Sequence, residues 1–304
     1  MPSFPVRRLL PLAALAAASA LILSACAGPA TSGGTDAGAD PDAELSWAIE
    51  GANLSNGHMD PQTSQLDVSA MVQRQVLDSL VFQEADGSFS PWLAKSWKVS
   101  DDGKTYTFEL RDDVTFTDGT PFDATAVKVN FDRIIDPKTE SASAAAMLGG
   151  ELYAGTKVIS DHTVEVDFTS PYAPFLQAAS TAQLGFWSPK VLKDSAAQLK
   201  AGGPDVNIGT GPFKLAEYTA DQEIVYTRND DYAWGPDGAK APKIKTLRVE
   251  LLPEASVRAG VLSSGEAQVA SQLPPSTVKQ LGKDVTVSAK EYPGLPYSLF
   301  LNEK

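Results

Sequence analysis

Few residues in this sequence could catalyse a reaction or bind a metal ion. There are two histidines, His58 and His162, and one cysteine, Cys26, and the histidines are too far apart in the chain to act as zinc ligands on one helix. The signatures of serine hydrolases, phosphate-binding loops and zinc proteases do not occur in the sequence. Neighbouring acids such as Asp101-Asp102 and Asp112-Asp113 are typical of solvated turns. We therefore expect neither an enzyme nor a bound metal or cofactor.

Cys26 is the residue with the clearest chemical role. Arg7 and Arg8 precede an apolar stretch at residues 9–23, which is shorter than the roughly 20 residues that a membrane-spanning helix needs. The pattern predicts a secretory signal over residues 1–25. Leu23-Ser24-Ala25-Cys26 resembles the lipobox of bacterial lipoproteins, which implies cleavage before Cys26 and a diacylglyceryl group on its sulfur. Since two or more acyl chains hold a protein stably on a bilayer, we expect a lipid-anchored protein on the extracytoplasmic face of the cell membrane.

The composition of the remaining chain favours a folded body on a flexible tether. Residues 26–44 are rich in Gly, Ala, Thr, Pro and Asp and contain almost nothing large and apolar, so we expect them to form the tether. The 304 residues carry a formal net charge of −13, which disfavours nucleic acid as a partner. Their length suggests about two domains. We expect the protein to act as a monomer.

The periodicity of the folded part mixes strands and helices irregularly, which predicts an α/β or α+β class. Helices are predicted over residues 70–81, from an N-cap at Asp123, and from Pro253 to Gly265, with Val257 on the packed face of the last. Strands are predicted at residues 45–49, 105–111, 114–117, 158–168, 213–218, 223–228, 246–252 and 269–273.

One long block closely resembles the family-5 extracellular solute-binding proteins, the dipeptide, oligopeptide and nickel receptors of ABC importers. It runs from Leu93 to Arg111 and reads LAKSWKVSDDGKTYTFELR. Further matching blocks follow in family order, and Gly209-Thr210-Gly211-Pro212 in one of them marks a sharp turn. These blocks lie at residues 116–122, 126–128, 171–176, 208–213, 229–232 and 262–266.

The resemblance implies a protein that captures a peptide and delivers it to an ABC permease. The same fold could instead carry a nickel chelate, a sugar or another solute. A third alternative is a lipoprotein that senses or chaperones peptides without transport.

The resemblance also implies a periplasmic-binding-protein-like type II fold, in which two lobes close on the ligand. Residues 45–270 would form the first lobe, with a core at 45–68 and 191–270 and an inserted subdomain at 69–190. Residues 271–304 would begin the second lobe, so we expect most of that lobe to be missing from this sequence. In peptide-binding members, the acid that pairs with the ligand's amino terminus lies in the missing part.

Candidate ligand contacts follow from rough matching to the family. We expect them at Ser64 and Gln65, at Met147 in a small-residue stretch, and at Phe186 and Trp187. Aromatic rings and a thioether suit a pocket that grips varied side chains, because they offer a large contact area with little directional demand. The alternative for Met147, Phe186 and Trp187 is a place in the core. Main-chain amides would hold a peptide backbone.

Overall fold

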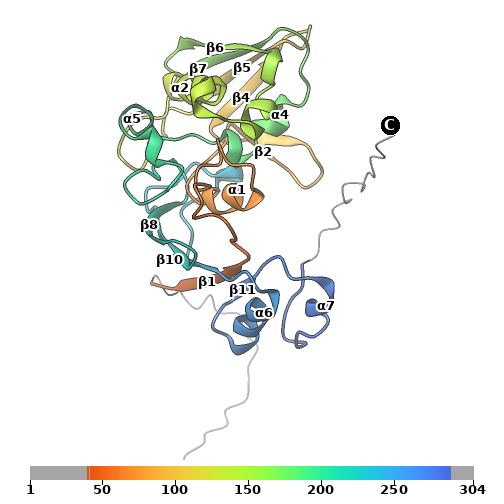
Figure 1. Ribbon diagram of the computed structural model, residues 1–304. Coiled ribbons are helices and arrows are strands. Elements are labelled where there is room, and N and C mark those ends of the chain that lie inside the picture. The colour runs from red at the N-terminus through yellow and green to blue at the C-terminus, as the bar shows by residue number, and fades with distance from the viewer. Residues whose placement is uncertain (1–39, 41, 289–304) are drawn as a thin grey trace, which may run out of the picture. The chain divides into compact units, whose positions relative to one another are not determined.

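The computed structural model describes residues 40 and 42–288 (Figure 1). Cys26, the expected signal and most of the expected tether lie outside these residues. A five-stranded sheet has the strand order β11-β1-β10-β9-β8. In it, β1 pairs in parallel with β10 and β11, while β9 is antiparallel to both β10 and β8. The strands are β1 Glu44–Ile49, β8 Phe213–Thr219, β9 Glu223–Arg228, β10 Thr246–Leu251 and β11 Val269–Ala270.

A second sheet is antiparallel throughout and has the strand order β4-β5-β7-β6. A two-stranded ribbon, β2-β3, precedes it in the chain. Together with the parallel pairs of the first sheet, these sheets confirm the mixed α/β class. The strands are β2 Val81–Gln83, β3 Phe89–Pro91, β4 Ala94–Val99, β5 Thr105–Leu110, β6 Tyr153–Ser160 and β7 Thr163–Phe168.

The helices are short, and the longest described is α2. Its N-cap is Asp123, whose carboxylate accepts a hydrogen bond of 2.8 Å from the amide of Ala126, and it ends at Ile135 before Asp136-Pro137. Both ends of α2 lie where the sequence predicts them, because an acidic N-cap residue favours a helix start and a proline disfavours continuation of the helix. The helices are α1 Asp67–Gln73, α2 Ala124–Ile135, α3 Ser143–Met147, α4 Phe175–Ala178, α5 Pro189–Asp194, α6 Ala255–Ser264 and α7 Pro275–Val278.

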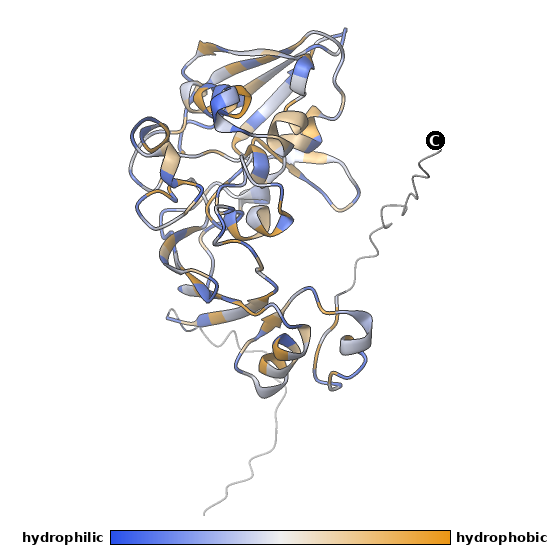
Figure 2. Ribbon diagram, viewed as in Figure 1, coloured by the Kyte–Doolittle hydropathy of each residue, from blue (hydrophilic) through white to orange (hydrophobic). Residues whose placement is uncertain are grey.

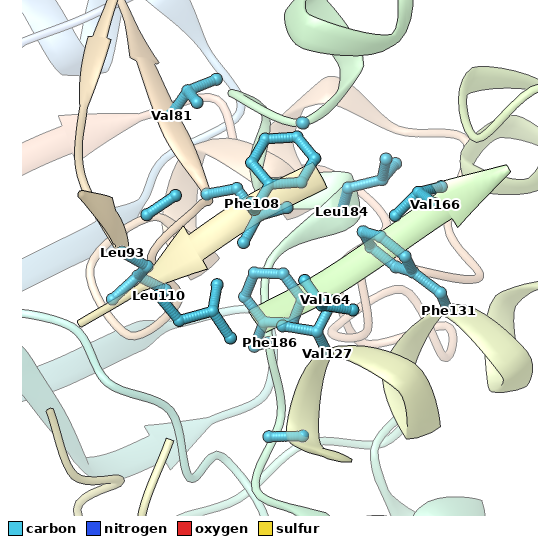
Figure 3. Close-up of a cluster of buried hydrophobic side chains, with 14 of the residues drawn as sticks. Val81, Leu93, Phe108, Leu110, Val127, Phe131, Val164, Val166, Leu184 and Phe186 are labelled. Carbon is cyan, nitrogen blue, oxygen red and sulfur yellow. The ribbon is translucent and has the colours of Figure 1, made fainter. Parts of the chain in front are cut away.

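The hydrophobic core has two clusters. In the first, Val127 and Phe131 of α2 pack with strand residues such as Phe108 and Val164, as the close-up in Figure 3 shows. Many of its contacts are edge-to-face aromatic pairs, for example Tyr106 with Phe175 at 5.0 Å between ring centroids. The second cluster covers the five-stranded sheet. Hydrophobic and hydrophilic residues are interspersed along the strands and helices (Figure 2), as one-sided burial requires.

The helix predicted over residues 70–81 is shorter than its apolar pattern. Helix α1 ends at Gln73, although Val76, Leu77 and Leu80 are all completely buried. The carbonyl of Val76 accepts a hydrogen bond of 2.8 Å from the amide of Gly211. A backbone carbonyl used in this way does not continue an i to i−4 ladder, so tertiary pairing overrides the helical pattern.

Three further predictions need correction. The single strand predicted at residues 158–168 is a hairpin of β6 and β7, which turns at Asp161 and His162. Residues 114–117 form only an isolated bridge between Thr115 and Pro121. Val257 is 46% exposed, and the buried residue of α6 is its neighbour Arg258.

Two glycines let the chain after residue 208 lie against the residues that follow α1. A Cβ atom on Gly209 would be 2.1 Å from the carbonyl oxygen of Val76, and one on Gly211 would be 2.6 Å from that of Gln75. Real Cβ contacts are never this short, so both positions require glycine. The Gly-Thr-Gly-Pro turn is therefore a site of close backbone approach, which is one of the uses of glycine.

We predict that Gly209→Ala destabilises the protein, because backbone must move to admit the new methyl group. Overpacking of this kind costs about 1–3 kcal/mol or more. Gly260→Ala is a matched control, since Gly260 lies in α6 and a Cβ there meets nothing within 4 Å. The control should be neutral or stabilising by up to about 1 kcal/mol. Urea denaturation of both variants measures the difference, and equal stabilities would contradict the prediction.

Candidate functional site

The carboxyl ends of the parallel strands form one candidate site. Strands β1, β10 and β11 end at Ile49, Leu251 and Ala270 along one edge of the sheet. In open α/β sheets, ligands bind outside this edge, where chain segments diverge and leave a crevice. A pocket of about 240 Å³ lies here, lined by Glu50, Gly51, Ala52, Asn53, Leu66, Asp67, Val68 and Gln272.

Unusual backbone conformations shape this edge pocket. Gly51 has a φ of +56°, and a Cβ there would be 2.5 Å from Cδ2 of Leu251. Asn53 and Gln272 also adopt positive φ values, 69° and 58°. The Gln272 side chain accepts a hydrogen bond of 3.0 Å from the amide of Glu50. For Asn53 and Gln272, which are not glycines, such φ values are unfavourable, and residues held in this way cluster at binding sites.

A buried arginine holds the strand ends beside the pocket. Arg258 is 2% exposed, and it donates hydrogen bonds to four backbone carbonyls, those of Leu252, Pro253, Ser271 and Gln272. The first two follow β10 and the other two follow β11. A rigid guanidinium fork with five donors can fix several oxygens at once, so Arg258 positions both strand ends at the edge pocket.

A larger groove lies beside α1, the helix whose Asp67 and Val68 line the edge pocket. Its volume is about 570 Å³, and its walls combine aromatic and small residues. Trp47 of β1 lines it and donates a hydrogen bond of 2.8 Å from Nε1 to the hydroxyl of Ser271. Helix α1 contributes to both hollows, so they are neighbours along it. The groove is lined by Trp47, Ala70, Met71, Arg74, Gln75, Phe82, Gln83, Trp92, Ser180, Thr181, Ala182 and Gln183.

Arg74 is held rigidly in the groove wall. Its Nη1 donates to the hydroxyl of Ser79 at 2.8 Å and to the carbonyl of Leu77 at 3.2 Å, and its Nη2 donates to the carbonyl of Ser180 at 2.8 Å. The guanidinium carbon lies 5.0 Å from the ring centroid of Trp92, at cation–π distance. Burial lowers the pKa of Arg74 to about 10, so the side chain is charged at neutral pH.

The carboxyl group of Asp78 is buried near Arg74. Asp78 is 0% exposed, and its Oδ2 accepts hydrogen bonds of 2.9 Å from Nε1 of Trp234 and 3.1 Å from the hydroxyl of Thr210. Burial raises the pKa of Asp78 to about 7, although these two donors and the charge of Arg74 oppose the shift. Asp78 is therefore partly protonated near neutral pH.

A second buried polar network joins the loop after β1 to α2. The side-chain Nε2 of Gln62 donates to Oδ1 of Asn130 at 3.0 Å and to the carbonyl of Gly185 at 2.9 Å. Asp60, which is 0% exposed, forms an ion pair with Arg133. Breaking a buried pair by removing one partner leaves an uncompensated charge, so this network holds the loop in place.

Two of the predicted contact residues lie next to the edge pocket. Ser64 is 4% exposed and its hydroxyl contacts that of Ser69 at 2.6 Å and Nδ1 of His58 at 3.2 Å. Gln65 is exposed and immediately precedes Leu66, which lines the pocket. Of the two, only Gln65 presents its side chain to solvent.

The other three predicted residues lie elsewhere. Phe186 is completely buried in the first core cluster. Trp187 is also completely buried, and its Nε1 donates to Oδ1 of Asp60 at 3.1 Å. Met147 is partly buried and packs against the first cluster. The structure does not bring these three into the edge pocket or the groove, and their contact with a ligand stays a prediction.

Sequence reasoning missed the groove residues Trp47, Arg74 and Trp92. They lie on β1, after α1 and before β4, and no spacing in the sequence connects them. Trp92 directly precedes the block from Leu93 to Arg111 that resembles the family. That position was the only local sequence signal for any of these three residues. Within residues 40 and 42–288, no group of three or more His, Cys, Asp or Glu side chains could hold a metal ion, and no helix is long and apolar enough to span a membrane.

A mixed sheet with a pocket at the carboxyl edge of its parallel strands is the arrangement in which open α/β sheets bind ligands. The sequence profile of the bacterial extracellular solute-binding proteins, family 5, matches residues 88–304. The chain belongs to this family. Membership places it among binding proteins rather than enzymes.

Individual relatives agree with this assignment. The nickel-binding periplasmic protein of Escherichia coli is 37% identical over 64% of this chain and 35% of its own length. The dipeptide-binding protein of Escherichia coli is 35% identical over 67% of this chain and 40% of its own. The chain thus spans well under half the length of these relatives. A solved structure of DppA from Helicobacter pylori in complex with the peptide STSA is 25% identical, with a TM-score of 0.66 over 79% of this chain and 48% of that one.

The buried carboxyl group makes the stability of the protein depend on pH. The pKa of Asp78 is raised to about 7 from its ordinary value of 3.8, so the folded state binds a proton more tightly than the unfolded state. Stability from this group therefore falls as pH rises from about 4 to about 7, by up to about 1.4 kcal/mol per pH unit. Above pH 7 its contribution is constant.

We predict that Asp78→Asn removes this dependence. The variant should gain stability relative to the wild type as pH rises from 4 to 7, measured by urea denaturation at each pH. Asp86→Asn is the control, because Asp86 is exposed and its pKa is lowered by hydrogen bonds from Ser88. A difference between Asp78→Asn and wild type that does not change with pH would refute the assignment.

Proposed function

We propose that this protein is the lipid-anchored, solute-binding component of an ABC importer, and that it captures dipeptides or oligopeptides for the permease. The observation that carries the proposal is a pocket at the carboxyl edge of the parallel strands, with a separate aromatic groove that α1 also lines, in a member of this family. Pocket walls of aromatic and thioether groups accept varied side chains. A relative named as a dipeptide-binding protein and a solved structure in complex with the peptide STSA support the same solute class.

The proposal includes a two-lobed protein that closes on its ligand. Residues 45–270 would be the first lobe, with residues 45–68 and 191–270 as its core and residues 69–190 as an inserted subdomain. The two sheets are built from different parts of the chain, which supports this division. The strands of the five-stranded sheet come from residues 44–49 and 213–270, and those of the four-stranded sheet come from residues 94–168. Residues 271–304 would begin the second lobe.

A nickel chelate is the second candidate solute. Its support is the relative at 37% identity, which is named as nickel-binding. Within residues 40 and 42–288, no group of three or more His, Cys, Asp or Glu side chains could hold a metal ion, so we expect these residues to contact a metal chelate through its organic ligand. Calorimetric titration of the purified protein with peptides and with a nickel–histidine complex separates the two candidates.

We predict that a peptide binds and that Gln65→Ala weakens its binding by about 2- to 10-fold, because one hydrogen bond is lost. Gln280→Ala is the control, since Gln280 is exposed and lines neither the edge pocket nor the groove.

A peptide present at 100 times its Kd should also raise the free energy of unfolding by about 2.7 kcal/mol. Nickel–histidine binding without peptide binding would replace the first candidate with the second.

We predict that the membrane anchor depends on Cys26. In the native host, Cys26→Ser should move the protein from the membrane fraction to the soluble fraction, because no acyl chains can be attached. The double variant Cys26→Ser/Ser32→Cys keeps one cysteine in the tether and should also remain soluble. An intact mass of the wild type without acyl groups would rule out the anchor.

A further inference from the structure

The groove beside α1 places one charged side chain among apolar and uncharged polar residues. Of the residues that line it, only Arg74 is charged. Around it lie Trp47, Met71, Phe82 and Trp92, and the last two contact each other edge to face at 5.9 Å between ring centroids. An apolar surface excludes water, and a charge beside it is screened less than a charge in open solvent.

Arg74 has no carboxylate partner among the described residues. No acid of residues 40 and 42–288 lies within 4.0 Å of its nitrogens, in contrast to Arg133, which pairs with Asp60. Asp78 is the near carboxyl group, but its Oδ2 already accepts from Trp234 and Thr210. The positive charge in the groove is thus left without an ion pair.

The donors of Arg74 are only partly used. Three of its five N–H groups bond to Leu77, Ser79 and Ser180, and these bonds fix the plane of the guanidinium against the ring of Trp92. The Nε–H and one Nη2–H have no partner among the described residues. Two donors on neighbouring nitrogens of a guanidinium match the two oxygens of a carboxylate.

We propose that Arg74 binds a carboxylate of the solute and that the aromatic walls of the groove take the apolar side chain next to it. The inference rests on the proposed function and specifies it. The preferred solute is a peptide with a free carboxyl terminus and an apolar or aromatic last residue. Because the guanidinium is already held in place, little side-chain entropy is lost when the carboxylate binds.

The test compares matched ligands on the wild-type protein, which avoids any effect of mutation on folding. Peptides ending in phenylalanine are titrated by calorimetry with a free carboxyl terminus and with a carboxamide terminus. Loss of a charged hydrogen-bonding partner should weaken binding by about 10- to 100-fold. The difference in affinity between the free-acid and carboxamide peptides should shrink as the salt concentration rises.

Variants then assign the effect to Arg74. Arg74→Met should bind the free acid and the amide equally, and Arg74→Lys, which keeps the charge but not the fork, should show an intermediate difference. Arg228→Met is the matched control, because Arg228 also donates to backbone carbonyls, those of Pro242 and Lys243, but lies outside the groove. It should keep the full difference between acid and amide. Thermal unfolding checks that each variant is folded.

The outcomes separate this inference from the proposed function. If peptides bind but acid and amide are equal in the wild type, the carboxylate site is wrong and peptide binding stands. If the difference persists in folded Arg74→Met, another residue binds the carboxylate and the inference is likewise overturned. If neither form of any peptide binds, the inference and the peptide class fail together.

Discussion

A backbone contact between residues 75–76 and residues 209–213 holds the binding region together. The carbonyls of Gln75 and Val76 accept hydrogen bonds of 3.0 Å from Phe213 and 2.8 Å from Gly211. Phe213 is the first residue of β8, so this contact attaches the end of α1 to the five-stranded sheet. The approach is possible only because Gly209 and Gly211 lack side chains. Backbone bonds of this kind are buried and must be satisfied, which makes them hard to replace.

The position of the groove depends on this contact. The segment from Arg74 to Asp78 lies between α1 and the first core cluster, so its backbone conformation determines where both charged groups point. The carboxyl group of Asp78 accepts hydrogen bonds from Thr210, which lies within residues 209–213, and from Trp234. Arg74 reaches Ser180 on the groove side. The short, non-helical segment from Arg74 to Asp78 therefore places the guanidinium of Arg74 in the groove wall and buries the carboxyl group of Asp78 nearby.

The edge pocket follows from a different constraint, the direction of the strands. Because β1, β10 and β11 are parallel, their carboxyl ends meet at one edge, and the segments that follow must diverge. Arg258 satisfies four carbonyls of those segments at once. A lysine could not do so, since it lacks the planar fork. The pocket is thus a consequence of topology, and Arg258 makes its rim a defined structure.

Local signals in the sequence determined the family, the class of fold and the bounds of several elements. The alternation from Thr105 to Leu110, the cap at Asp123 and the turn at Gly209–Pro212 act over a few residues, so they are legible without a structure. Tertiary structure decided what local patterns cannot carry. The apolar pattern after Gln73 fits a helix, but the carbonyls of Gln75 and Val76 accept hydrogen bonds from Phe213 and Gly211 instead. Trp47, Arg74 and Trp92 come from separate elements, and only packing brings them into one groove, because a binding surface is made by contacts between segments distant in the chain.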